Sequence, residues 1–148
     1  MNLDRYPYRV RESFLIFEFE SEGPKGVIKK IARFTQMGKN LYNFGFGDLD
    51  DDAGTISDKV VSNNGDGNKI LVTVAVIICD FANEYRDATI FIKGSTPART
   101  RWYQMNINAF RKEIGLIMNV LGYRNNKWEP FQKGFNYEAF MGNRPPAH

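Results

Sequence analysis

The sequence predicts an α+β fold, with an antiparallel sheet of about five strands and two helices packed on one face. Apolar stretches of strand length, bounded by turn residues, occur before residue 50 and again at residues 89–92 and 136–141. Two longer apolar patterns repeat at three- and four-residue spacing, which is typical of helices that bury one face. The 148 residues fit one domain, expected over 1–148 with short flexible tails at 1–7 and 143–148.

The first predicted element is a hairpin. Apolar and polar residues alternate towards the end of residues 13–20. Residues 21–26 contain two glycines and a proline, which favour a turn, and residues 27–34 mix apolar with basic side chains. A third strand is expected at 41–47, where Gly45 and Gly47 suit a bulge or a close approach of another backbone.

An acidic loop is expected at residues 48–54. Asp48, Asp50 and Asp52 have the opening spacing of a calcium loop, but Ala53 occupies the position that requires glycine and Lys59 the position of the bidentate glutamate. A solvated turn is therefore preferred over weak Mg²⁺ or Ca²⁺ binding, and the sequence predicts no metal site and no cofactor. A short strand is expected at 55–61, followed by a loop.

Residues 68–85 allow two interpretations. The run at 70–78 is rich enough in β-branched residues for a buried strand, yet Ile70, Val74, Ile77 and Phe81 recur at helical spacing. The length of the pattern favours a helix over 68–85.

A second helix is predicted over 97–121, followed by extended segments at 127–131 and 136–141, of which at least the latter joins the sheet. Gly122 is expected as its C-cap. The apolar face of this helix comprises Tyr103, Ile107, Phe110, Ile114, Ile117 and Leu121.

The candidate functional site is the turn between the strand at 89–92 and this second helix. A Ser or Thr before Pro97 is a favoured N-cap, and proline suits the first helical position. Free backbone N–H groups and the positive end of the helix dipole would then lie beside basic and hydroxyl side chains, as an anion requires. Neither a Walker A motif nor a Rossmann fingerprint is present. The candidate anion-binding residues are Lys93, Gly94, Ser95, Thr96, Arg99 and Arg101, with Trp102 as a candidate stacking surface.

Other features exclude several classes of function. The only histidine, His148, is in a proline-rich tail, which argues against a Ser-His-Asp triad, a Cys-His pair or a His-ligated zinc site. Cys79 is the only cysteine, so disulfide frameworks and Cys-based zinc sites are excluded. The sequence shows no leader and no apolar run of membrane-spanning length, so we expect a cytoplasmic protein that does not bind a membrane. The formal charge of +3 permits a nucleic-acid partner without indicating one.

Several segments carry a resemblance to a known family. The sequence resembles a small family of uncharacterised single-domain proteins, a domain of unknown function, from Bacteroidota-type bacteria. This implies a bacterial protein and carries over no catalytic role. The similar segments are 45–48, 62–66, 69–75, 93–101 and 137–140.

Three functions remain open from the sequence. The first is a binding module in which the turn holds a phosphate of nucleic acid or of another phosphate-bearing ligand, with Trp102 at the rim. The second is a histidine-free nuclease in which Arg99 or Arg101 stabilises charge and Glu138 or Asp48 is the base. The third is a subunit that binds another protein. In the alternative without function, Thr96 only caps the helix and the two arginines pair with acidic residues or water.

Overall fold

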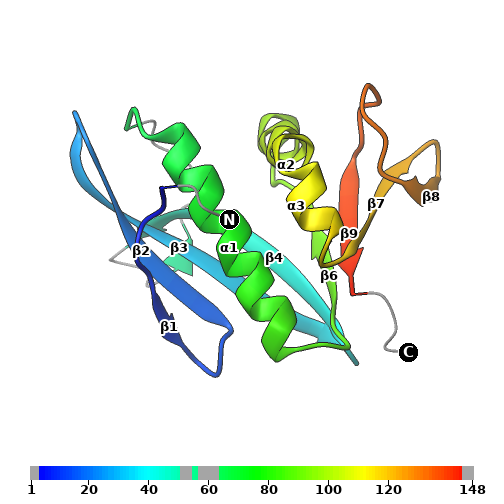
Figure 1. Ribbon diagram of the computed structural model, residues 1–148, viewed down its shortest axis with the longest axis horizontal. Helices are drawn as coiled ribbons and strands as arrows, with labels where there is room; N and C mark the ends of the chain where they lie inside the picture. The colour runs from blue at the N-terminus through cyan, green and yellow to red at the C-terminus, as the bar shows by residue number, and fades with distance from the viewer. Residues whose placement is uncertain (1–3, 51–54, 57–63, 145–148) are drawn as a thin grey trace. The chain divides into compact units, whose positions relative to one another are not determined.

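The computed structural model of the chain describes residues 4–50, 55–56 and 64–144, and it confirms the α+β class (Figure 1). The helices are α1 (Gly67–Glu84), α2 (Pro97–Ala109) and α3 (Arg111–Gly115). The strands are β1 (Arg9–Arg11), β2 (Ile16–Gly23), β3 (Gly26–Gly38), β4 (Leu41–Asp50), β5 (Thr55–Ile56), β6 (Thr89–Ile92), β7 (Asn119–Arg124), β8 (Lys127–Pro130) and β9 (Ala139–Asn143).

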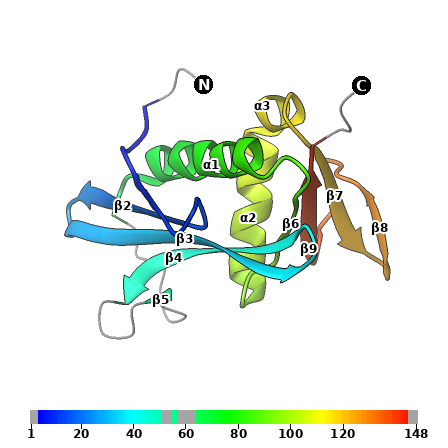
Figure 2. The same ribbon diagram turned by 90° about the horizontal axis from the view of Figure 1, so that it is seen from below.

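The sheet is mixed, so the prediction of about five antiparallel strands is wrong. Its strand order is β1-β2-β3-β4-β6-β9-β7-β8, and β5 pairs with β4 outside this order (Figure 2). β4 and β6 are parallel, with Leu41 opposite Thr89, whereas β6 and β9 are antiparallel. The parallel pair arises because α1 lies between β4 and β6 in the chain, and a helix is the usual connection between parallel strands.

The chain forms two compact units, of which the first comprises residues 1–34 and 45–81. It contains the predicted hairpin, with Phe17 of β2 opposite Ala32 of β3. Phe34 of β3 stacks on Phe81 of α1 with 3.8 Å between ring centroids, and the edge of Phe17 meets the ring of Phe34. These aromatic side chains are almost completely buried. They give the first unit its apolar core.

The helical interpretation of residues 68–85 is confirmed, because α1 spans Gly67–Glu84. Tertiary burial explains why a segment rich in β-branched residues is helical: its apolar side chains include Ile70, Val74 and Ile77, which are buried. Within the described ranges, no helix has the length and apolar character that crossing a membrane requires.

A polar cluster fixes the start of α1. Asp66 accepts hydrogen bonds from the Tyr6 hydroxyl and from Ser21, each at 2.5 Å, and the Tyr6 N–H donates to Thr73 of α1 at 2.9 Å. Burial alone would raise the pKa of Asp66, but the hydrogen bonds from Ser21 and Tyr6 outweigh it and lower that pKa. Tyr6, within the first expected tail, is therefore buried against this cluster; residues 1–3 and 145–148 of the expected tails lie outside the described residues.

The prediction of a loop from Asp48 is wrong for residues 48–50, which belong to β4. Asp48 belongs to β4, and its carboxylate forms an ion pair with Lys30 of β3, whose side chain is fully buried. A buried lysine needs such a partner, since an unpaired charge in the interior is costly. Residues 51–54, the rest of the predicted loop, and residues 57–61 of the predicted short strand lie outside the described residues.

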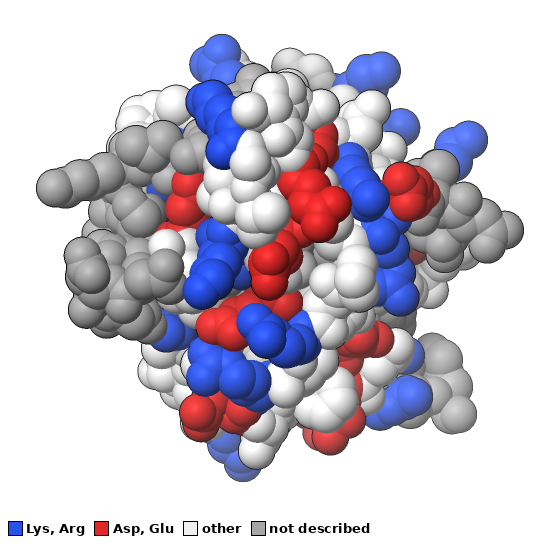
Figure 3. All heavy atoms as spheres, turned by 90° about the vertical axis from the view of Figure 1, so that its left-hand side faces the viewer, with Lys and Arg blue, Asp and Glu red and all other residues white. Residues whose placement is uncertain are grey.

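Charges of both signs are interleaved on the hairpin. Arg11 pairs with Glu18 at 2.7 Å, and Glu20 lies opposite Lys29 in the register of β2 and β3. Figure 3 shows the corresponding alternation of basic and acidic side chains on this face.

The second compact unit comprises residues 35–44 and 82–148. In it, β6 lies between the start of β4 and β9, and β7 pairs with β9 on one side and β8 on the other. Tyr103 of α2 is buried, and its ring meets the edge of Phe44 of β4 at 6.0 Å between centroids. The apolar side of α2 thus packs on the sheet.

The predicted helix over 97–121 is interrupted at Phe110 and is wrong beyond residue 115. The backbone at Phe110 leaves helical geometry (φ −111°, ψ 25°), α3 ends at Gly115, and residues 119–124 form β7 instead. The apolar residues of this segment keep helical spacing, but its pairing with β8 on one side and β9 on the other stabilises a strand instead. Gly122 is therefore no C-cap: it is a strand residue, and a Cβ there would lie 2.4 Å from the ring of Tyr137.

Candidate anion-binding pocket

The turn between β6 and α2 forms as predicted. β6 ends at Ile92, Thr96 is the N-cap of α2, and Pro97 occupies the first turn. The Thr96 side-chain oxygen accepts a hydrogen bond from the Arg99 N–H at 3.2 Å, which satisfies one of the amides that a helix start leaves without a partner.

Gly94 is required by a close approach of backbone to backbone. Its φ is not among the positive values that other glycines of the described chain adopt. Instead, a Cβ at Gly94 would lie 2.3 Å from the Thr100 nitrogen and 2.6 Å from the Arg99 carbonyl carbon. The Gly94 N–H donates to the Thr100 hydroxyl at 3.0 Å, so the turn lies directly against the first turn of α2.

This packing leaves fewer free N–H groups than the sequence suggested. The N–H groups of Gly94 and Arg99 donate to Thr100 and Thr96, and Pro97 has none. The prediction that free backbone N–H groups are available to an anion is therefore wrong at these positions. At these positions, attraction for an anion must come from side chains.

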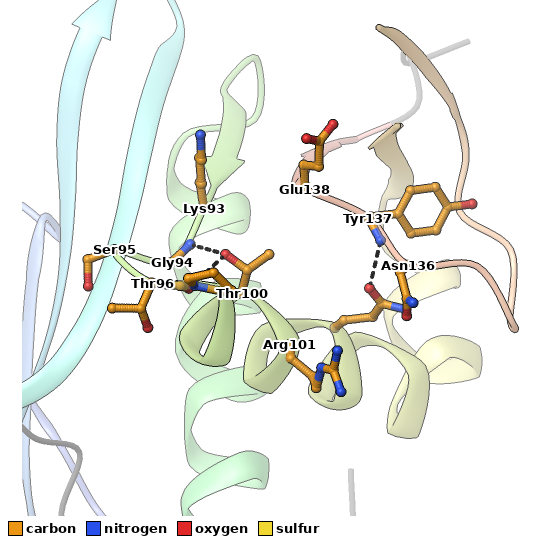
Figure 4. Close-up of a pocket in the computed structure, with 11 residues that line it drawn as sticks. Lys93, Gly94, Ser95, Thr96, Thr100, Arg101, Asn136, Tyr137 and Glu138 are labelled. Carbon is orange, nitrogen blue, oxygen red and sulfur yellow. Dashed lines mark hydrogen bonds between the residues drawn. The ribbon is translucent and has the colours of Figure 1, made fainter. Parts of the chain in front are cut away.

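A pocket of about 340 Å³ lies beside the turn (Figure 4). One wall is the turn and the start of α2, and the other is the segment that leads into β9. The residues that line it are Lys93, Gly94, Ser95, Thr96, Pro97, Thr100, Arg101, Gln104, Asn136, Tyr137 and Glu138.

The sheet explains why Lys93 and Glu138 share this pocket. Ile92, the last residue of β6, is opposite Phe140 near the start of β9. Because the strands are antiparallel, the residue after β6 and the residue before β9 emerge at the same end of the pair. Figure 4 shows their side chains extending in the same direction from the two walls.

Helix geometry separates the two candidate arginines. Successive residues of an α-helix are about 100° apart, so Arg99 and Arg101 are about 200° apart around α2. Positions 97, 100, 101 and 104 share the face that lines the pocket, and Arg101 is among them. Arg99 and Trp102 do not line the pocket; the Trp102 ring is half-buried and meets the edge of Tyr103.

Gln104 joins the two walls. Its side-chain nitrogen donates to the Phe135 carbonyl, and its side-chain oxygen accepts from the Tyr137 N–H at 2.9 Å. The Tyr137 hydroxyl accepts from the Gln132 N–H at 3.0 Å and lies 3.2 Å from Glu129, to which it donates. Burial raises the pKa of Tyr137, so its hydroxyl stays protonated and remains a donor.

Three charged side chains line the pocket. Lys93, Arg101 and Glu138 are exposed, and within the part of the chain that the structure describes no ion pair involves any of them. Two cations against one carboxylate give the pocket a net positive charge. Among the same residues, no group of three or more His, Cys, Asp or Glu side chains is placed to hold a metal ion.

The sequence does not single out the polar residues of the second wall. Gln104, Asn136 and Tyr137 gave no signal as a group, because they come together only when β9 pairs with β6. Glu138 was considered only as a base. The spacing of 97, 101 and 104 along one helix face is the signal that could have linked Gln104 to the turn.

The fold and the pocket define the class: an α+β protein with a mixed sheet and a small charged pocket at one end of the β6–β9 pair. The chain belongs to the Family of unknown function (DUF6934), which matches residues 2–145. No curated protein and no solved structure matches the chain.

Proposed function

We propose that this pocket binds a phosphate-bearing ligand, with nucleic acid as the leading candidate. The observation that carries the proposal is that Lys93 and Arg101 line one pocket without an ion-pair partner among the described residues. Charge-assisted hydrogen bonds from these groups are the main means by which proteins hold phosphate oxygens. The hydroxyls of Ser95 and Thr96 add further donors at the same wall.

The cations have different roles in this proposal. Arg101 supplies a planar, two-pronged donor that matches two phosphate oxygens, whereas Lys93 supplies a compact charge. Arg99 projects from another side of α2 and does not line the pocket; in this proposal it contacts a neighbouring phosphate of a longer strand. Trp102 is half-buried and adjacent to Arg101 in the chain, and in this proposal it is the stacking surface for a base.

The test is binding of a fluorescent single-stranded oligonucleotide, measured by anisotropy as a function of salt. Affinity should fall as salt rises, and Lys93→Ala with Arg101→Ala should reduce the slope of log K against log salt by about 0.7 per lost phosphate contact. Lys112→Ala, which removes an exposed cation of α3 outside the pocket, is the matched control and should leave the slope unchanged. Absence of binding at low salt, or an unchanged slope in the double variant, would refute the proposal.

A histidine-free nuclease is the second candidate, and the shared pocket of Arg101 and Glu138 favours it. Of the two carboxylates considered as the base, Asp48 is already paired with the buried Lys30, so Glu138 is the better candidate. Incubation of a labelled strand with the protein tests this. Shortening of the strand that Glu138→Gln abolishes, while binding persists, would support an enzyme; an intact strand after prolonged incubation argues for binding alone.

A further inference from the structure

We propose that the ligand of this pocket is a ribonucleotide unit, with its phosphate at Lys93 and a ribose hydroxyl donating to Glu138. The inference rests on the proposed function and specifies its ligand. It follows from the carboxylate of Glu138, because a site that binds phosphate alone does not require a negative charge.

A carboxylate in a phosphate pocket opposes binding by repulsion between like charges. Glu138 nevertheless lines the pocket, and its side chain has no hydrogen-bond or ion-pair partner among the described residues. An ionised carboxylate only accepts hydrogen bonds. It therefore favours a ligand that carries a donor group close to its phosphate.

The position of Glu138 is fixed by the backbone around it. Its N–H donates to the Tyr123 carbonyl of β7 at 2.8 Å. The preceding residue, Tyr137, is buried and is held to α2 by Gln104. The side chain of Glu138 is thus presented from a wall that hydrogen bonds within the protein hold in place, which limits the cost of ordering on binding.

The dimensions of the pocket suit one nucleotide unit. Its volume of about 340 Å³ is at the small end of ligand sites, which commonly measure about 300–1,000 Å³. Figure 4 shows the side chains of Lys93 and Glu138 extending in the same direction from opposite walls, whereas Arg101 lies farther along α2 and extends the other way. A phosphate held by Lys93 therefore has its attached sugar beside Glu138, the only carboxylate of the lining.

Ribose hydroxyls are the donors that best meet this requirement. A carboxylate that accepts from a ribose hydroxyl next to a bound phosphate is an established arrangement in dinucleotide sites. The 2′-hydroxyl is also the group by which proteins distinguish RNA from DNA. The pocket should consequently prefer ribonucleotides to deoxyribonucleotides of the same base.

The experiment compares oligouridine with oligodeoxyuridine of equal length, so that only the sugar differs. Anisotropy should show RNA binding about tenfold more tightly, the ratio expected for one charge-assisted hydrogen bond. Glu138→Gln should reduce this ratio without weakening DNA binding, because it removes the charge and retains the size. Glu84→Gln, at an exposed position of α1, is the control and should preserve the ratio.

Competition with monophosphates distinguishes two sources of the ligand. Displacement of the probe by uridine 5′-monophosphate but not by its 2′-deoxy analogue would identify a free ribonucleotide; RNA preference without such displacement would identify a strand. Both results support the inference. Equal binding of RNA and DNA, or a Glu138→Gln variant that strengthens both equally, would overturn it and leave the phosphate site standing. Failure of both probes to bind would instead overturn the proposed function.

Discussion

Replacing Gly94 with alanine should destabilise the protein by crowding the turn against α2. The added Cβ would lie 2.3 Å from the Thr100 nitrogen and 2.6 Å from the Arg99 carbonyl carbon, and neither backbone atom can rotate away. Relief requires the turn to move off the helix, which breaks the 3.0 Å hydrogen bond from the Gly94 N–H to Thr100. Overpacking costs about 1–3 kcal/mol and the lost hydrogen bond about 1 kcal/mol, so we expect a total of about 2–4 kcal/mol.

Urea unfolding followed by circular dichroism measures this cost. Gly115→Ala is the matched control, because Gly115 lies in α3 with open space where its Cβ would be. That variant should be neutral or stabilising by up to about 1 kcal/mol, since alanine restricts the unfolded chain. If Gly94→Ala unfolds within about 0.5 kcal/mol of the unchanged protein, the close approach does not constrain this position.

Two further predictions concern the first compact unit. Asp48→Asn should cost about 3 kcal/mol in urea unfolding, because the fully buried Lys30 loses the negative charge of this carboxylate; a cost below about 1 kcal/mol would show that the pair contributes little. Because Ser21 and Tyr6 hold the folded pKa of Asp66 below its ordinary 3.8, this carboxylate contributes stability above that pH and loses it as the pH falls through the folded pKa. The difference in unfolding free energy between the unchanged protein and Asp66→Asn should therefore shrink below pH 3.8, and a difference that stays constant contradicts this reasoning.

Local chemistry was enough to predict the turn. The strand end, the N-cap at Thr96 and the first helical residue at Pro97 depend on a few adjacent residues, and all three are present in the structure. The reason for a glycine at position 94 depends instead on its contacts in three dimensions. Only the structure distinguishes a close approach from a positive φ.

The parts that depend on pairing between distant segments could not be predicted from spacing. The sequence predicts the end of a helix where β7 lies, because Ile114, Ile117 and Leu121 keep helical spacing. Pairing with β9 makes residues 119–124 a strand instead. A local signal was overlooked: Asn125 and Asn126 both have positive φ between β7 and β8, and paired asparagines of this kind are typical of a two-residue hairpin turn.

The candidate site was predicted in part for the same reason. The turn residues were found because they are consecutive, whereas the wall at 136–138 joins them only through the sheet. Because Arg99 and Arg101 are close in sequence, the sequence predicts that both contribute to the anion site. Their separation around α2 places only Arg101 in the pocket lining.

The pairing of β6 with β9 has a consequence for the order in which the molecule is completed. β6 is synthesised long before β9, so during translation its free edge has no antiparallel partner and is open to association with other chains. Lys93 and Glu138 meet only after that pairing, so the pocket does not exist in a nascent chain that lacks β9. A ligand that binds the pocket would bind only the completed sheet, and by mass action would draw newly made chains towards it.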